Sequence, residues 1–490
     1  MSFKSPYKSS WKDECGVFGI WNHPDASRLT YLGLYAMQHR GQEAAGIVSL
    51  DSNDKNQVHK THKALGLVAD VFNQNNLNLL TGNAAIGHVR YSTTGDNLIM
   101  NAQPLTANLH NGPVAIAHNG NIVNASILRE ALQRDGAIFQ ATTDSEILLH
   151  LLAKNPSNHL VTALIESLKN LSGAYSFTIL AHDRLIAARD PFGFRPLVLG
   201  EIKSKLGNTY IIASETCALD LIGAQLVREI LPGEVVEISS EGLKSYKFES
   251  EKSATHKTAH CVFEHVYFAR PDSVVFGKSV YSSRKKFGEQ LAVESGIDAD
   301  IVIPVPDSGV PSAIGYSQKS GIPFEFGIIR NHYIGRTFIQ PTQSIRDIGV
   351  KIKLNPQPDI LKGKRVIVID DSLVRGTTSQ KIINLIRGAG ALEVHLRIAS
   401  PPTTGPCFYG VDTPQKSELI ASNNSLENIR TFIGADTLAY LSEEGMWQAM
   451  NSGPESFCAA CFNGHYPTSL KGVENKKNQE ISIKSTGKEV

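Results

Sequence analysis

The stretch VIVIDDSLVRGTTS, residues 366–379, constrains the fold more than any other part of the chain. A continuous apolar run ends in two adjacent acids, a loop of glycine and hydroxyl residues follows, and the helical pattern SQKIINLIRGAG (379–390) begins there. Such a run is typical of a strand buried on both faces, as in a parallel sheet covered by helices. Residues 300–306, DIVIPVP, show the same pattern. We therefore expect the second half to be an α/β domain with a mainly parallel sheet.

Length and composition set the outer limits. A chain of 490 residues with 41% apolar composition exceeds what one core usually supports, so we expect two domains. Lys and Arg total 48 against 47 Asp and Glu, which gives no general attraction to nucleic acid or to an anionic membrane. No apolar run approaches the roughly 20 residues of a membrane span, and the start MSFKSPYKSS lacks the apolar region of a signal peptide. These features favour a cytoplasmic protein.

The pattern changes near residue 250. Before it, short β-like runs alternate with Gly, Asn and Asp turn signals, as expected for antiparallel sheets. The polar stretch SYKFESEKSATHKTAH (245–260) predicts a linker or domain edge. We expect one domain over 15–250 and a second over 251–466, while the polar, charged end predicts a disordered tail over 467–490.

The loop after the apolar run can bind a phosphorylated sugar. Loop N–H groups and the helix N-terminus can hold a phosphate, and Asp370 and Asp371 can bind sugar hydroxyls or a divalent cation. An ordinary strand-to-helix turn, capped by Asp and Ser, is the alternative for a generic Asp-Asp-Ser sequence. The complete string resembles the signature of type I phosphoribosyltransferases, which bind phosphoribosyl pyrophosphate (PRPP) with magnesium. The stretch IVIPVPDSGVPSA (301–313) resembles the pyrophosphate loop of that family.

That resemblance implies roles for particular residues. Binding of PRPP is implied for Asp370, Asp371, Arg375, Gly376, Thr377 and Thr378, and binding of Mg²⁺ for Ser308, Asp370 and Asp371. The stretch 327–347, with three arginines and little periodicity, is predicted to be a long surface loop, and by the resemblance it closes over PRPP as a lid. A lid has a physical purpose here because a carbocation-like sugar and a reactive amine both need water excluded.

The first half carries five short motifs in a fixed order: CGVFGI (15–20), MQHRGQEAAGI (37–47), GHVRYST (87–93), AHNGNIVN (117–124) and TTDSE (142–146). Together they resemble the glutaminase domain of N-terminal-nucleophile amidotransferases. With the second half they resemble the glutamine PRPP amidotransferase family over nearly all of 15–466. The resemblance implies an αββα sandwich followed by a phosphoribosyltransferase domain. It also implies the first committed step of de novo purine synthesis, in which PRPP, glutamine and water give 5-phosphoribosylamine, glutamate and pyrophosphate.

The resemblance assigns the glutaminase site. Cys15 is the nucleophile, Asn119 and the Gly120 N–H form the oxyanion hole, and Arg90 and Asp144 hold the α-carboxylate and α-amine of glutamine. Taken singly, Arg90 also suits a surface strand, and the sequence HNGN suits a hairpin turn. Purine nucleotides as feedback inhibitors and a homotetramer are further implications of the family.

Cys15 needs a base, and a free α-amine on the same residue, with a pKa of about 8, can serve as one. That amine exists only if residues 1–14 are removed as a propeptide, which places the scissile bond between Glu14 and Cys15. Family members with such a leader are processed in this way. We therefore expect the active chain to begin at Cys15.

Structural disulfides are rare in cytoplasmic proteins, so thiol catalysis, metal binding and burial compete as roles for the other cysteines. The C-x-x-C pair Cys458 and Cys461 is alone a weak sign of redox or zinc chemistry, and a second local pair is absent. By the family resemblance, Cys261, Cys407, Cys458 and Cys461 match the four ligands of a [4Fe–4S] cluster, with buried free thiols as the alternative. Cys217 has no partner in this scheme, so we expect it to pack in a core.

Two other functions compete with this interpretation. A sugar-phosphate-aminating amidotransferase would carry isomerase domains in place of the 366–379 stretch. A PRPP-sensing regulator would keep the fold without catalysis, but the presence of Cys15, Asn119, Gly120 and Asp144 argues against it.

Overall fold

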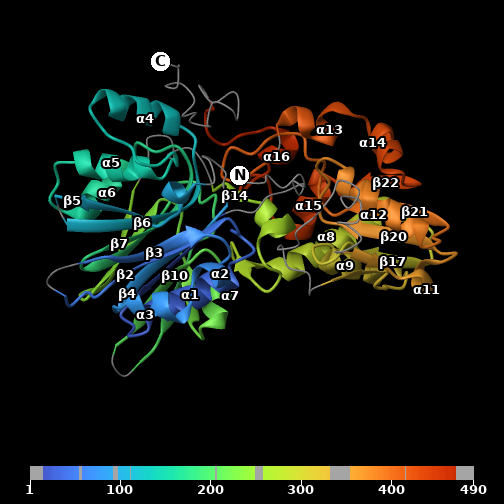
Figure 1. Cartoon of the computed structure of the whole chain (residues 1–490). Helices are drawn as coiled ribbons and strands as arrows, with labels where there is room; N and C mark the ends of the chain where they lie inside the picture. The colour runs from blue at the N-terminus through green and yellow to red at the C-terminus, as the bar shows by residue number, and fades with distance from the viewer. Residues whose placement is uncertain are drawn as a thin grey trace, which may run out of the picture.

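The computed structural model describes residues 15–54, 58–91, 98–110, 112–204, 207–248, 258–331, 354–413 and 415–470. Four sequence expectations fall wholly or mostly outside these residues: the propeptide, the linker, the lid and the disordered tail. Figure 1 shows two lobes side by side, a blue-to-green lobe formed by the first half and a yellow-to-red lobe formed by the second.

The first half contains two stacked antiparallel sheets. The seven-stranded sheet has the order β11 (Gln225–Glu229), β9 (Val198–Ile202), β10 (Thr209–Ala213), β1 (Gly16–Trp21), β4 (Ala84–Arg90), β2 (Ala44–Leu50) and β3 (Lys60–Leu65). The six-stranded sheet has the order β13 (Gly242–Lys247), β12 (Glu234–Ser239), β8 (Arg184–Arg189), β7 (Gly173–Ala181), β6 (Gly112–Ile122) and β5 (Leu105–Leu109). Side chains alternate along each strand, so Phe18 and Ile20 of β1 face the helices while Val17 faces the other sheet.

Helices cover both outer faces of the two sheets. On the seven-stranded sheet lie α1 (Ala26–Ala36), α2 (Val68–Val71), α3 (Gln74–Leu79) and α7 (Cys217–Leu221). On the six-stranded sheet lie α4 (Ala125–Arg134), α5 (Glu146–Lys154) and α6 (Leu160–Leu168), and η1 (Ile99–Asn101) is a short 3-10 turn. The layers confirm the αββα sandwich. Cys217 is 4% exposed and packs in the α1-side core, as expected.

The second half is built on a parallel sheet of the order β17 (Ile301–Pro304), β20 (Arg365–Asp370), β21 (Glu393–Ile398) and β22 (Thr437–Tyr440). One face packs on α8 (Val280–Ser295), α9 (Val310–Ser320) and α15 (Glu443–Met450), and the other on α12 (Thr377–Gly388) and α14 (Leu426–Ile433). Val302 and Ile367 face the first group, whereas Ile303 and Val368 face the second. Burial on both faces explains the continuous apolar runs in the sequence.

The remaining short elements of the second half are β14 (His260–Cys261), the π-helical turn η2 (Glu264–Phe268), β15 (Val274–Val275), β16 (Lys278–Ser279), β18 (Ile328–Arg330), β19 (Leu354–Pro356), α11 (Pro358–Leu361), η4 (Lys416–Glu418), α13 (Ile420–Asn423), β23 (Phe457–Cys458) and α16 (Ala460–Asn463). The start of the expected 327–347 loop differs from the prediction, because β18 pairs antiparallel with β19 there. Three residues were too short a run to be distinguished from a loop by periodicity.

The two lobes meet along several segments that are distant in sequence. β14 pairs in parallel with β23, which brings the C-terminal segment to the junction (Figure 1). Asn121 Nδ2 of β6 donates to the Phe408 carbonyl (2.9 Å), and Arg195 Nε donates to the Tyr409 carbonyl (2.9 Å). Among the described residues, no helix combines the length and the apolar character needed to cross a membrane.

Candidate active site

Cys15 lies immediately before β1, at the junction of the two lobes. It is 9% exposed, and its Sγ donates a long hydrogen bond to the Tyr91 carbonyl (3.5 Å). The register pairs Gly16 of β1 with Val89 of β4, so Arg90, at the end of β4 and 3% exposed, follows at the same edge of the sheet. The sandwich thus brings together the predicted nucleophile and one predicted glutamine-binding residue from opposite ends of neighbouring strands.

Asn119 and Gly120 lie on β6 of the other sheet. Asn119 is 1% exposed, and its Nδ2 donates to Ser214 Oγ (3.4 Å), which in turn accepts from the Val17 N–H of β1 (3.0 Å). Gly120 has φ of +146°, and a Cβ there would lie 2.1 Å from the Ala174 carbonyl oxygen. Only glycine fits this backbone, which presents the peptide group in a conformation that L residues rarely adopt.

Asp144 is buried next to the same strand. Its Oδ2 accepts from the Ile122 N–H (2.8 Å), and its Oδ1 lies 3.8 Å from His118 Nδ1. Burial alone would raise its pKa, but His118 and hydrogen bonds from Ile122 and Thr143 outweigh burial, so the pKa of Asp144 is lowered. The carboxylate stays anionic and can attract an ammonium group.

The second cluster of predicted residues lies at the carboxyl ends of β17 and β20. Asp370 ends β20, Asp371 follows it, and both are buried, at 8% and 5% exposed. A hydrogen bond joins Ser308, in the loop after β17, to Asp371. Burial and the adjacent Asp371 carboxylate raise the pKa of Asp370 well above its usual value, and burial raises that of Asp371 against the opposing charge of Arg284. Two crowded, desolvated carboxyl groups favour a cation between or beside them.

The loop and first turn of α12 complete this second site. Gly376 precedes the helix with φ of +74°, and Thr377 and Thr378 are exposed in its first turn. Arg375 makes an ion pair with Glu418 (3.0 Å). A helix N-terminus with exposed hydroxyl groups suits an anionic ligand such as a phosphate.

Four cysteines line one cavity at the lobe junction. Its lining consists of Phe194, Cys261, Phe263, Cys407, Tyr409, Val411, Cys458, Ala460 and Cys461. Register pairing sets Cys261 opposite Cys458 in the β14–β23 ladder, and all six cysteines of the chain are free thiols. Burial raises the pKa of Cys458 to about 12, and burial together with the other three cysteines raises that of Cys461.

The cavity measures about 20 Å³, roughly the space that one water molecule needs. Across the described ranges, no three His, Cys, Asp or Glu side chains converge on a point that could hold a single metal ion. A tetrahedral zinc ion holds its thiolates within about 4 Å of one another, given Zn–S bonds of about 2.3 Å. The fold therefore places the four predicted cysteine ligands around one cavity, but they are not close enough together to coordinate a single metal ion.

Several buried charged residues around Cys15 were missed from the sequence. Arg40 Nε donates to the Cys15 carbonyl (3.1 Å), and the same guanidinium pairs with Glu215 and Glu264. A usable signal was present, because Glu264 is a lone acid inside the apolar run CVFEHVYFA (261–269), and an acid so placed usually has a buried partner. The identity of that partner could not be read from the sequence.

Comparison with known proteins agrees with both halves of the site. Residues 88–221 match the family model of a glutamine amidotransferase domain, and residues 286–399 match that of a phosphoribosyl transferase domain. The chain is 50% identical over 470 residues to amidophosphoribosyltransferase 1, chloroplastic, of Arabidopsis thaliana, which covers 95% of this chain and 81% of the relative. It is 47% identical over 463 residues to the amidophosphoribosyltransferase of Bacillus subtilis, covering 94% and 95%.

A solved structure is similar over nearly its whole length. Glutamine PRPP amidotransferase from B. subtilis, complexed with ADP and GMP, superimposes with a TM-score of 0.86 at 46% identity, covering 93% of this chain and 98% of that one. The chain therefore belongs to the amidophosphoribosyltransferase family and is a glutamine-dependent enzyme that aminates PRPP in purine biosynthesis.

Proposed function

We propose that glutamine is hydrolysed at Cys15 in the first lobe and that the ammonia released there reacts with PRPP at Asp370 and Asp371 in the second. The observation that carries this proposal is the presence of both clusters in one chain. Buried Cys15 stands at the strand edge with Arg90, and two crowded carboxyl groups end a parallel strand next to a helix N-terminus.

In the first site, Cys15 Sγ attacks the amide carbon of glutamine and its proton passes to the α-amine of the same residue. Asn119 Nδ2 turns from Ser214 to the developing oxyanion, and the Gly120 N–H donates to the same oxygen. The amine returns the proton to the departing ammonia, and water then hydrolyses the thioester to glutamate. Arg90 and Asp144 hold the carboxylate and ammonium of the substrate.

This mechanism requires a free α-amine on Cys15, so we propose that the Glu14–Cys15 bond is cleaved before the enzyme is active. We thereby propose that this chain is of the type in its family that is made with a leader segment, here residues 1–14. An internal cysteine has no α-amine, so its thiol would need a different base. The Tyr91 carbonyl, which accepts a hydrogen bond from Sγ (3.5 Å), is not basic enough for that role.

In the second site, the first turn of α12 binds a phosphate of PRPP through N–H groups and the Thr377 and Thr378 hydroxyls, with Arg375 adding positive charge. Asp370 and Asp371 bind the ribose hydroxyls. Ser308, Asp370 and Asp371 would also hold Mg²⁺, which neutralises charge on the departing pyrophosphate when bound. The raised pKa values of the two acids fit this assignment, because a cation offsets the cost of ionising both.

We further propose that Cys261, Cys407, Cys458 and Cys461 hold a [4Fe–4S] cluster with a structural role. The donor set fits, since four reduced thiols line one otherwise apolar cavity, and cluster thiolates stand further apart than those around a single ion. When bound, the cluster would tie the C-terminal segment to the lobe junction. Purified protein should then contain iron and acid-labile sulfide at four each per chain. Zinc-loaded, colourless protein with full activity would contradict it.

Purine nucleotides are the proposed inhibitors, supported by the B. subtilis relative whose structure holds ADP and GMP. Three further points stay predictions. The oligomeric state is predicted to be a homotetramer, which light scattering can measure, and the location is predicted to be cytoplasmic, which fractionation can measure. The absence of nucleic-acid and membrane partners is the third.

The direct test of the proposed function follows the nitrogen atom. Purified mature enzyme is incubated with PRPP, magnesium and glutamine labelled with ¹⁵N in the amide group. We expect one pyrophosphate and one glutamate per ¹⁵N-labelled phosphoribosylamine. Pyrophosphate release without labelled product, or glutamate release with no use of PRPP, would contradict the coupling of the two sites.

A further inference from the structure

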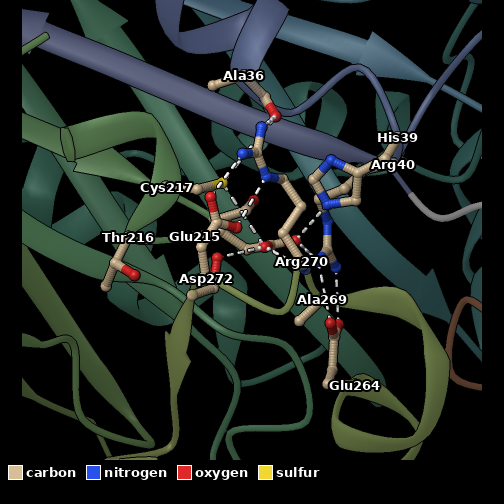
Figure 2. Close-up of polar contacts among 12 residues, drawn as sticks. Ala36, His39, Arg40, Glu215, Thr216, Cys217, Glu264, Ala269, Arg270 and Asp272 are labelled. Atoms are coloured by element: carbon tan, nitrogen blue, oxygen red, sulfur yellow. Dashed lines mark hydrogen bonds and ion pairs between the residues drawn. The ribbon is translucent and has the colours of Figure 1, made fainter. Parts of the chain in front are cut away.

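A buried network of charges joins the two lobes directly behind Cys15. Figure 2 shows Arg40 with dashed lines to Glu264 and Glu215, close to His39. The side chains of Arg40, Glu215 and Glu264 are all 0% exposed. Arg40 follows α1 in the first lobe, and Glu264 opens η2 in the second. These three side chains therefore form an interdomain contact that is shielded from water, whereas His39 beside them is 27% exposed.

Glu264 holds Arg40 by two hydrogen bonds. Arg40 Nη1 donates to Glu264 Oε2 (2.9 Å), and Nη2 donates to Glu264 Oε1 (2.7 Å). A bidentate pair of this kind fixes the plane of the guanidinium as well as its position. Arg195 Nη1 lies 3.5 Å from Glu264 Oε1, so a second buried cation balances the network.

Glu215 has other partners besides Arg40. Its Oε1 lies 2.8 Å from His39 Nε2, while its Oε2 accepts from the Arg270 N–H (3.0 Å) and from Ser273 Oγ (2.7 Å). Figure 2 draws Glu215 together with Arg40 and Arg270. Glu215 thus connects several segments of the chain. Glu264 pairs both of its oxygens with the Arg40 guanidinium, and this pairing fixes the orientation of Arg40.

The third nitrogen of the same planar group contacts the backbone of Cys15. Arg40 Nε donates to the Cys15 carbonyl oxygen at 3.1 Å. Because the guanidinium is rigid, fixing its two Nη atoms also fixes the direction of its Nε–H. Once the peptide bond before Cys15 is cleaved, that residue keeps a backbone attachment on its carboxyl side alone. A hydrogen bond to its carbonyl then limits rotation of the group that carries both Sγ and the α-amine.

We propose that Glu264, supplied by the second lobe, is a positioning residue for the glutaminase reaction: it orients Arg40, and Arg40 holds the carbonyl of Cys15 so that the thiol and amine face the substrate. The inference rests on the proposed role of Cys15 as nucleophile. It assigns to the phosphoribosyltransferase half a direct part in the geometry of the glutaminase centre.

The test compares glutamine-dependent and ammonia-dependent synthesis in Arg40→Lys, Glu264→Gln and the double variant. We expect each single variant to lower kcat with glutamine at least about tenfold, since small misplacements of reacting groups are costly. The KM for glutamine should change by less than about threefold, because Arg90 and Asp144 are untouched, and the ammonia-dependent rate should be retained. If Glu264 acts through Arg40, the double variant should be no worse than Arg40→Lys alone.

A control is Glu234→Gln, which breaks a half-buried bidentate pair with Arg228 (2.8 and 2.7 Å) in the first lobe. It should leave both activities unchanged. Arg40→Lys keeps the buried positive charge, so it remains informative if Glu264→Gln fails to fold. Full kcat with glutamine in either single variant, equal loss of both activities, or additive losses in the double variant would overturn the inference. Cys15→Ala in parallel tests the proposed function itself, because glutamine-dependent synthesis by that variant would refute the nucleophile and not the positioning.

Discussion

Replacing Gly410 by alanine tests how the second lobe bears on the oxyanion strand. Gly410 lies in the loop after Cys407 and has φ of +109°. A Cβ built on it would stand 3.1 Å from both the Cα and the carbonyl carbon of Gly120, and 3.3 Å from Arg195 Nη2. Contacts this short require a shift of a few tenths of an ångström, and the Gly120 backbone is held in the β6–β7 ladder on its other side.

The expected effect has two parts. An L residue at this φ costs about 1–3 kcal/mol of backbone strain, which lowers the thermal midpoint. Displacement of Gly120 should lower kcat with glutamine about tenfold, since a shift of about 1 Å at a reacting centre can cost about 100-fold. The PRPP site does not contain Gly120, so ammonia-dependent synthesis should stay within about twofold of wild type.

Gly242→Ala separates strain from displacement. Gly242 has φ of +102°, close to that of Gly410, but a Cβ there would meet nothing within 4 Å. Both variants should therefore lose similar thermal stability, and Gly410→Ala alone should lose glutamine-dependent activity. Equal kinetics with glutamine in the two variants would refute the argument that this loop supports the oxyanion strand.

Three further predictions follow from single sites. Asp370→Asn and Asp371→Asn together should lower the rate with either nitrogen donor about 100-fold or more, equivalent to about 3 kcal/mol of lost stabilisation, in a steady-state pyrophosphate assay; a wild-type rate with ammonia would contradict this. Burial lowers the pKa of His88 to about 3, so its stabilisation is present above pH 6.5 and is lost as the pH falls towards 3. In the His88→Gln variant, the free energy of unfolding should fall by about 2 kcal/mol less than in wild type when the pH is lowered to 5, as measured by denaturant unfolding. An unchanged dependence of that free energy on pH would show that His88 is not the group responsible. Intact-mass measurement of active enzyme should give a chain that begins at Cys15, and full activity with residues 1–14 attached would exclude the α-amine as the base.

The parallel sheet could be predicted because its strands are buried on both faces. Val366 to Ile369 form an unbroken apolar run, and the two acids that follow mark the edge where ligands bind in such sheets. The sandwich of the first half was harder to predict from hydrophobic periodicity than the parallel sheet. Strands such as β1, β4 and β7 are buried along their whole length and so show no regular polar–apolar alternation. The prediction of the sandwich came instead from the ordered motifs around Cys15 and Asn119, which resemble a known family.

The interdomain contacts could not be predicted, for a physical reason. Arg40 and Glu264 are separated by 224 positions, and no local pattern encodes which buried acid meets which buried base. The same holds for Gly410 against Gly120, where a backbone in the other lobe adds a close approach to the positive φ that already favours glycine. Sequence patterns report which face of an element is buried, whereas the partner across an interface depends on how complete lobes dock.

The most direct test of the two-site mechanism is the rate of phosphoribosylamine synthesis by Cys15→Ala with each nitrogen donor. The substitution removes the Sγ atom from a side chain that contacts the Tyr91 carbonyl and leaves the second lobe unchanged. We expect synthesis from glutamine to fall below detection, while synthesis from ammonium at high concentration and pH stays within about twofold of wild type. Loss of the ammonia reaction in a correctly folded variant, or continued synthesis from glutamine, would contradict the assignment of the two reactions to two separate sites.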